Sequence, residues 1–289
     1  MSDVFMRPKI KKDTMTPLKI LIDSPLNFRQ LRAQDNLQIS QWHKLLQSEL
    51  GYAHPASELK KKHFGSPLGE SVVFAALNES GDLMAVSSFF RMPGNLRTKQ
   101  AVWQPGDIVT SPAARGKGLF AEVNQRILNE LSREDLVIGF PNSAALNPWK
   151  KLGWPVLMET MTVRGFGWRP SRRLKLEALS SLYGASDSGL IAYIQHRFNQ
   201  PDYRFSVHPE YFFVHRGQLC GVFSRHGAAT SRAPMPLGYR IVLAPAQDRP
   251  MLPRYSRPSG HVIGRPGQTY EQTLVVLNQI SPLAFLDTL

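Results

Sequence analysis

The fold is decided by residues 106–120, Gly-Asp-Ile-Val-Thr-Ser-Pro-Ala-Ala-Arg-Gly-Lys-Gly-Leu-Phe. This stretch runs from the end of an expected strand, through a glycine-rich turn, into a helix expected to begin near Leu119. A turn of this kind presents backbone N–H groups at the positive end of a helix dipole, where a phosphate binds without a side chain. Gly116 and Gly118 let the backbone approach a ligand closely, and Lys117 adds positive charge. An ordinary strand–helix turn could carry the same glycines. This pattern alone therefore indicates either a phosphate-binding turn or an ordinary structural turn.

Two other phosphate-binding loops fit this turn poorly. A Walker loop needs Ser or Thr after its lysine, whereas Gly118 follows Lys117. A Rossmann fingerprint would place its third small residue at Ala121, which is a permitted variant. The chain lacks the opening βαβ unit and the ribose-binding acid that should accompany that fingerprint.

The elements expected on both sides of the turn alternate between strands and helices. Before it lie a hairpin and a long strand, and after it lie a helix, a buried strand, a short helix and a further strand. Their expected ranges are 72–77, 83–90, 98–110, 119–131, 137–140, 142–151 and 154–165. This order predicts an α/β fold in which helices cover a mixed sheet.

Two sequence motifs in this half resemble those of the GNAT acyltransferases. Their acetyl-CoA motif reads Gln or Arg, x-x-Gly-x, then Gly or Ala, and Arg115 and Gly118 match it. Phe120 stands where the family has a small residue, a version similar to a branch that includes polysaccharide-biosynthesis acyltransferases. Further along, residues 139–142 and 149–154 resemble the second family motif, Asn followed by Tyr-x-Lys-x-Gly-Phe.

The resemblance covers residues 27–165 and implies a GNAT fold that takes acetyl-CoA or another acyl-CoA as co-substrate. It implies that Ile108, Val109 and Thr110 bind the pantetheine arm, and that Asn142 and Trp149 line its thiol end. The pyrophosphate would be held by the backbone of the turn, namely Arg115, Gly116, Lys117, Gly118, Leu119 and Phe120.

In the reaction that the resemblance implies, an amine attacks the thioester directly in a ternary complex. The enzyme must then provide a neutral amine, polarise the carbonyl and protonate the leaving thiolate. Asp107 is the best candidate for the base, although it could equally be a strand-end residue that holds the loop. Trp149 stands where the family often has an acidic Tyr, and its indole N–H has no useful acidity. Glu159 and Tyr183 are weaker candidates.

A chain of 289 residues is too long for one average domain and predicts two. We expect a short extension over residues 1–25, a GNAT acyl-CoA-binding domain over 26–168, and a C-terminal α+β domain over 169–289. The polar segment 168–173 marks the expected boundary. The second domain is either a degenerate GNAT-like half, which would cover the acceptor side of the cleft, or an unrelated α+β cap.

The net charge of +13 predicts an anionic partner. An acyl carrier protein is therefore an alternative donor, whereas a nucleic-acid-binding module is disfavoured because aromatic residues are not interleaved with Lys and Arg. The acceptor is expected to be a small amine, such as an amino sugar or an amino acid derivative. The single cysteine, Cys220, argues against a metal site. Without a signal peptide or an apolar stretch of about 20 residues, a cytoplasmic protein without a membrane span is expected.

Overall fold

The computed structural model describes residues 25–93, 100–165, 172–174, 188–199, 203–209, 211–217, 219–224, 238–244, 256–269 and 272. The predicted N-terminal extension lies almost wholly outside this part of the chain, as does Tyr183. Of the helices within it, none has the length and apolar character needed to cross a bilayer.

The described strands form one mixed sheet in the order β1-β2-β3-β4-β5-β12-β6-β11-β10-β9-β8-β7. Its parallel pairs in the described chain are β4 with β5 and β10 with β11. The strands are β1 (Asn27–Gln30), β2 (Val72–Leu77), β3 (Leu83–Met92), β4 (Val102–Thr110), β5 (Leu136–Gly139), β6 (Val156–Gly165), β7 (Arg172–Leu174), β8 (Tyr203–His208), β9 (Tyr211–Arg216), β10 (Leu219–Ser224), β11 (Gly238–Ala244) and β12 (Ser256–Gly264). The helices are α1 (Asn36–Leu50), α2 (Ala56–Phe64), α3 (Leu119–Glu130), α4 (Ser143–Lys151) and α5 (Ser188–Phe198). The mixed α/β fold expected from the sequence is confirmed.

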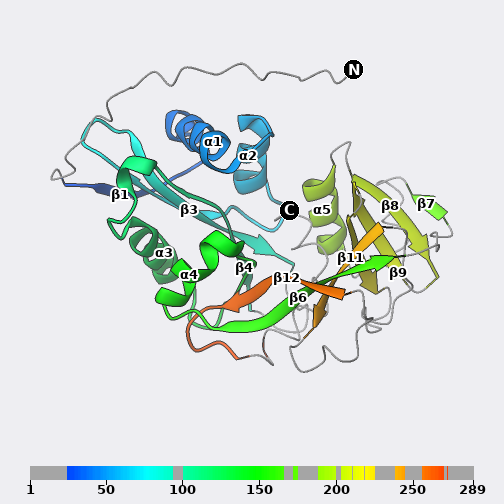
Figure 1. Ribbon diagram of the computed structural model, residues 1–289. Coiled ribbons are helices and arrows are strands. Elements are labelled where there is room, and N and C mark those ends of the chain that lie inside the picture. The colour runs from blue at the N-terminus through cyan, green and yellow to red at the C-terminus, as the bar shows by residue number, and fades with distance from the viewer. Residues whose placement is uncertain are drawn as a thin grey trace, which may run out of the picture.

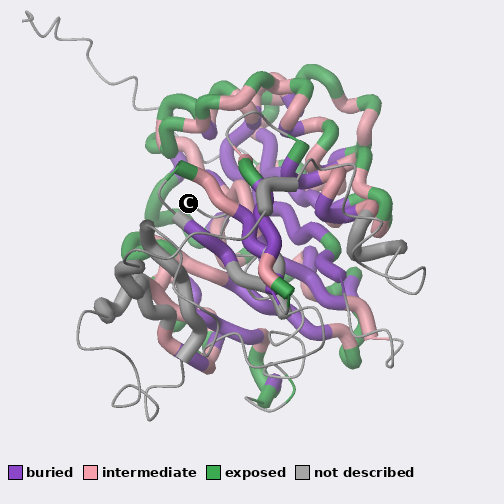
Figure 2. Tube along the Cα trace, turned by 90° about the vertical axis from the view of Figure 1, so that its right-hand side faces the viewer, coloured by how far each residue is buried: buried purple, intermediate pink, exposed green. Residues whose placement is uncertain are grey.

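Helices cover both faces of the sheet in the first half of the chain (Figure 1). On one face Trp42 and Leu46 of α1 and Leu59 of α2 are buried against β2 and β3. On the other face α3 buries Val123 and Ile127 in a second apolar cluster. The helical spacing of these residues places them on one side of each helix, so the sheet becomes the middle layer. Figure 2 shows the buried residues gathered along the strands, inside an outer layer of exposed segments.

Strands β4 and β5 pair over only two residues and then separate. The parallel ladder joins Val102 to Leu136 and Trp103 to Val137. Beyond it, β5 pairs with β12, while β4 continues to Thr110 with β3 as its partner. The side of β4 that β5 leaves is therefore open along the second part of the strand.

Segment 56–64 forms the helix α2. Pro55 is its N-cap residue, Glu58 lies in the first turn, and Lys61, Lys62 and His63 lie in the last turn. Acidic residues at the start and basic residues at the end of a helix both favour the helix dipole. Lys61 and Lys62 thus belong to the end of a helix, although a run of lysines is also typical of a loop.

The C-terminal half contributes the strand β12 to the middle of the sheet, between β5 and β6. Strand β12 is irregular, with a register shift between Pro258 and Gly260. At its other end Ile263 packs directly on β5, where a Cβ atom added to Gly139 would lie 2.8 Å from its side chain. The predicted boundary between residues 168 and 169 stays a prediction.

Candidate active site

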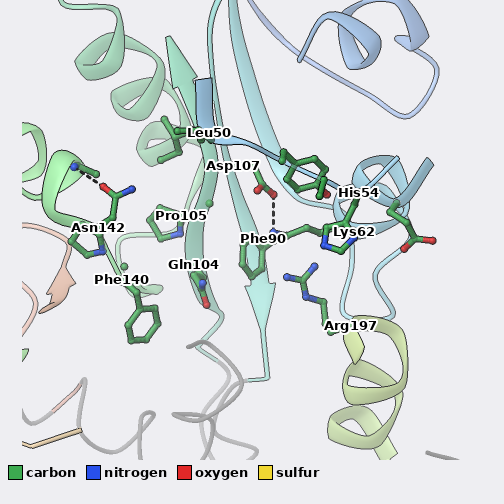
Figure 3. Close-up of a pocket in the computed structure, with 18 of the residues that line it drawn as sticks. Leu50, His54, Lys62, Phe90, Gln104, Pro105, Asp107, Phe140, Asn142 and Arg197 are labelled. Carbon is green, nitrogen blue, oxygen red and sulfur yellow. Dashed lines mark hydrogen bonds and ion pairs between the residues drawn. The ribbon is translucent and has the colours of Figure 1, made fainter. Parts of the chain in front are cut away.

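A cavity of about 390 Å³ opens where β4 and β5 separate. One wall is formed by residues 104–108 of β4 and another by residues 139–142 with Ala145 and Trp149. The end of α1 at Leu50, the loop 51–54 and helix α2 close a third side (Figure 3). The cavity therefore lies beside the strand that carries Asp107.

Asp107 sits in a β-bulge of β4. Val86 pairs with Val109, but Ser88 pairs with Gly106, so β4 has one residue more than β3 at this point. Asp107 adopts φ 51°, in the left-handed region, where Asp and Asn are the most tolerant residues after glycine. The indole N–H of Trp42 donates to the Asp107 carbonyl oxygen at 2.9 Å. This contact fixes the bulge to helix α1.

The carboxylate of Asp107 is held by two neighbouring residues of α2. Its Oδ2 atom lies 2.7 Å from Lys62 Nζ and 2.7 Å from His63 Nε2. A carboxylate only accepts hydrogen bonds, so the His63 proton is on Nε2 and its Nδ1 accepts from the Ser71 hydroxyl at 3.0 Å. The His63 ring is fully buried, whereas the Lys62 and Asp107 side chains are 13% exposed.

These contacts set the protonation of all three groups. Burial would raise the pKa of Asp107, but Lys62 and then His63 outweigh it and hold that pKa well below its usual range. Burial lowers the pKa of His63 to about 4, so the ring is neutral at physiological pH. Burial also lowers the pKa of Lys62 to about 8, against the opposing pull of Asp107. Lys62 is thus the member of this cluster that can gain or lose a proton near neutral pH.

Of the residues assigned to the pantetheine arm, the structure brings Ile108 to the cavity wall. Val109 is buried on the α1 face and pairs with Val86, and Thr110 pairs with Ala85. The side chains of Val109 and Thr110 therefore do not form part of the described cavity wall.

Asn142 and Trp149 both line the cavity, at the wall opposite α2. The Asn142 side chain is the N-cap of α4 and accepts from the Ala145 N–H at 2.9 Å. Trp149 is 3% exposed and packs against Phe120 and Trp154, with ring centroids 5.0 and 4.2 Å apart. Both residues also have structural roles, so their presence in the wall does not by itself test the roles implied by the resemblance.

The turn of residues 115–118 is exposed at the start of α3 and does not line the cavity. Gly116 and Gly118 have φ 77° and 75°, and a Cβ atom added to either would meet nothing within 4 Å. Gly118 is the N-cap of α3 and offers no side chain to the first N–H groups of the helix. Lys117 is exposed, and Arg115 pairs with Glu49 of α1. An exposed turn at a helix start that has no side-chain cap fits a phosphate group.

The second half of the chain adds residues that sequence reasoning missed. Helix α5 brings His196 and Arg197 to the cavity, and β8 and β9 bring Tyr203 and Arg216. Figure 3 shows Arg197 reaching from α5 toward Phe90. No local motif marks these residues, because their role depends on how the sheet continues through β12.

The remaining candidates lie elsewhere. Glu159 is in β6, where it pairs with Ala244 and His261, and it is not part of the described cavity wall. Within the described ranges no group of three or more His, Cys, Asp or Glu side chains could hold a metal ion. Metal independence therefore stays a prediction that only a measurement can test.

No known family profile matches this chain, and no curated protein matches it in sequence. Solved structures do match. A protein of Pyrococcus horikoshii assigned as an acetyltransferase has a TM-score of 0.53 at 12% identity, over 85% of this chain and 90% of its own. A GCN5-related N-acetyltransferase from Kribbella flavida has a TM-score of 0.54 at 10% identity, over 84% and 72%. A conserved protein of Enterococcus faecalis V583, described as a probable N-acyltransferase, has a TM-score of 0.55 at 10% identity, over 84% and 73%. The chain therefore has the fold of the GCN5-related N-acetyltransferases.

Proposed function

We propose that this protein is an N-acyltransferase that moves an acetyl or longer acyl group from acyl-CoA to a small amine. The observation that carries the proposal is the separation of β4 from β5, which opens a cavity along β4, the strand that leads through the glycine turn into α3. The fold of the GNAT enzymes, found in the neighbours named above, supports it. The polysaccharide-linked branch stays a prediction.

The residues that would hold acyl-CoA fall into two groups. The backbone of residues 115–120 would bind the phosphates, and the wall containing Ile108, Asn142 and Trp149 would contact the arm that carries the thioester. Acyl-CoA would supply the acyl group in activated form. An acyl carrier protein is the alternative donor, favoured by the net charge of +13.

Proton transfer is the chemistry left to the protein. An ionised carboxylate of low pKa takes up a proton poorly, so we assign the step to Asp107 and Lys62 together. Asp107 positions the Lys62 amine at 2.7 Å, and Lys62 exchanges a proton with the acceptor amine at the cavity. Tyr52 also lines this region, and burial followed by Asp107 raises its pKa, so its hydroxyl keeps its proton and can donate a hydrogen bond.

Calorimetry with acetyl-CoA tests the donor site. Gly118→Val should weaken binding at least tenfold, about 1.4 kcal/mol, because the new side chain occupies the approach to the turn. Gly81→Val is the matched control: Gly81 has φ 80°, and its added Cβ would also meet nothing within 4 Å, but it lies in the β2–β3 turn. Both variants suffer the same backbone strain. Equal affinity of the two folded variants for acetyl-CoA would refute the donor site.

Release of the CoA thiol, followed with a panel of amines, tests the reaction itself. Turnover should depend on the amine and form an amide. If acetyl-CoA binds but no amine in the panel is acylated, the assignment as an N-acyltransferase of small amines fails, and carrier-bound acyl groups become the donors to examine.

A further inference from the structure

Lys62 presents an amine in the wall of the cavity and is largely withdrawn from solvent. Its side chain is 13% exposed, whereas that of Lys61, the preceding residue of α2, is 43% exposed. The Nζ atom of Lys62 lies 2.7 Å from Asp107 Oδ2 and 5.0 Å from the centre of the Phe90 ring. Figure 3 shows the Lys62 side chain reaching from α2 to Asp107. The amine is therefore held at a defined place in the cavity wall.

The surroundings of Lys62 favour its neutral form near physiological pH. Burial lowers the pKa of Lys62 to about 8, and the carboxylate of Asp107 on β4 opposes this effect. The charges of Arg197 on α5 and Arg216 on β9 lower this pKa further, while the neighbouring His63 is neutral. A lysine that is neutral keeps a lone pair on its nitrogen even when its N–H groups donate hydrogen bonds. Such an amine is a nucleophile toward carbonyl carbon.

The proposed acyl transfer places this nucleophile close to the thioester. The acceptor amine exchanges a proton with Lys62, so its nitrogen lies within hydrogen-bond distance of Nζ, ~3 Å. The same nitrogen must approach the thioester carbon to ~3–3.5 Å. The Nζ atom of Lys62 is then no more than ~6–7 Å from that carbon. When no acceptor separates them, the flexible four-carbon stem of lysine allows the amine to close this distance.

We propose that Lys62 is itself a site of acylation, and that its Nζ atom takes the acyl group when acyl-CoA is bound without an acceptor amine. The lone pair of Nζ forms the bond to the acyl carbon, and the C–S bond breaks with its electron pair on sulfur. The proton that the nitrogen loses passes to the leaving thiolate. The products are an amide on Lys62 and free CoA, and no further reactant is needed. The inference rests on the proposed acyl transfer and adds a second destination for the acyl group.

Acylation of Lys62 would inactivate the protein. An amide nitrogen carries no positive charge, so the modified residue no longer neutralises the carboxylate of Asp107. It also has no proton to exchange with an acceptor amine. The acylated protein should therefore turn over amines at least about tenfold more slowly than the unmodified protein.

Mass spectrometry of the parent protein tests the site. The protein is incubated with acetyl-CoA in a buffer without amines, and fragmentation of the peptide assigns the acetyl group among Lys60, Lys61 and Lys62. Labelling of Lys62 should saturate as the acetyl-CoA concentration rises, because it requires the bound donor. Excess desulfo-CoA, which lacks the thiol, should suppress it. Lys150 and Lys151 are exposed at the end of α4 and report uncatalysed acetylation, which should neither saturate nor respond to desulfo-CoA.

The pH dependence of labelling gives a second signature. Below pH 8 the neutral fraction of Lys62, and with it the rate of labelling, should rise about tenfold per pH unit and then level off. Acetylation of Nα-acetyl-lysine in solution should instead keep rising toward the ordinary lysine pKa of ~10.4. Labelling of Lys62 that follows the free lysine and does not saturate is uncatalysed, and overturns the inference.

Variants assign the label to one residue and to the donor site. Lys62→Arg keeps the positive charge beside Asp107 but cannot form the amide, and should remove the saturable labelling. Lys61→Arg is the matched control on the same helix and should leave it unchanged. Gly118→Val should need at least about tenfold more acetyl-CoA for half-maximal labelling, whereas Gly81→Val should label at the same concentration as other folded variants with an intact turn.

The outcomes separate this inference from the proposed function. Saturable labelling of Lys62 supports the inference, whether or not an amine in the panel is acylated. Turnover of amines by a protein whose Lys62 stays unmodified at saturating acetyl-CoA overturns the inference and leaves acyl transfer intact. Saturable labelling at Lys61 in place of Lys62 overturns it as well. If calorimetry detects no binding of acetyl-CoA and no labelling saturates, both fail.

Discussion

The buried contacts of Asp107 make a quantitative prediction about stability. Replacing Asp107 by Asn keeps the shape of the side chain and removes the negative charge that lies 2.7 Å from the Lys62 Nζ atom, at a pair whose two side chains are each 13% exposed. Removing one partner of a buried ion pair costs about 3–5 kcal/mol, because the other charge is left without compensation. A pair at the surface would cost only about 0–1 kcal/mol. We therefore expect Asp107→Asn to lose about 3–5 kcal/mol at neutral pH.

Urea unfolding of four proteins measures this loss: the parent, Asp107→Asn, Lys62→Met and the double variant. The double variant should recover most of the stability lost in Asp107→Asn, because no buried charge is left unmatched. If the free energy of unfolding falls with urea concentration at the same slope in all four proteins, their unfolding transitions can be compared. A loss below about 1 kcal/mol in Asp107→Asn, or a double variant no more stable than it, would refute the account of the network.

The same four proteins should differ in how stability depends on pH. The pKa of Lys62 is about 8 in the folded chain and 10.5 in the unfolded chain. Between these values the unfolded state binds a proton that the folded state does not, so this residue makes the protein more stable as pH rises. One pKa unit corresponds to about 1.4 kcal/mol, so the gain is about 3 kcal/mol and is absent below pH 8. Lys62→Met should remove this gain, and a parent-like curve for Lys62→Met would contradict it.

Four further predictions concern activity and the core. Asp107→Asn should lower the rate about 10²- to 10⁴-fold near neutral pH. This loss should shrink as pH rises toward ~10.4, the pKa of the acceptor amine, because the amine is then already neutral in solution. A loss below threefold at every pH would remove Asp107 from the mechanism. Dialysis against a chelator should leave the rate unchanged, and activity restored only by zinc or magnesium would show the opposite. Trp149→Ala should cost about 3–5 kcal/mol in urea unfolding. Folded Trp149→Phe should keep kcat within about threefold, unless the indole N–H takes part in the reaction.

The parts of the fold that could be predicted are those encoded over short stretches of sequence. The expected ranges 137–140, 142–151 and 154–165 correspond to β5 (Leu136–Gly139), α4 (Ser143–Lys151) and β6 (Val156–Gly165). The glycines of the turn have the positive φ that only glycine adopts freely. Hydrophobic periodicity and turn-forming residues are local properties, so the sequence of each segment was sufficient to predict it.

The cavity wall contributed by the second half of the chain could not be predicted, because the cavity is assembled from distant segments. Arg197 and Arg216 line the same cavity as Lys62 although they come from the second half of the chain, which joins the sheet through β12 between β5 and β6, and this pairing of distant strands leaves no local pattern. Helix α2 was hidden for a different reason. Its run of lysines has the composition of a solvated loop. The role of Lys62 depends on the carboxylate of Asp107, which both Lys62 and His63 contact.

Asp107 itself shows how a bulge changes what a sequence pattern means. In a regular strand, neighbouring residues point to opposite faces, so Asp107 and Ile108 should not share a cavity. The extra residue in β4 breaks this alternation, and both residues line the wall. At φ 51° a β-branched residue would be strained. Glycine would keep the conformation of the bulge but lose the carboxylate, whereas Asp provides both the conformation and the charge. Asn shares the conformational tolerance, which is why Asp107→Asn separates the charge of this residue from the bulge that presents it.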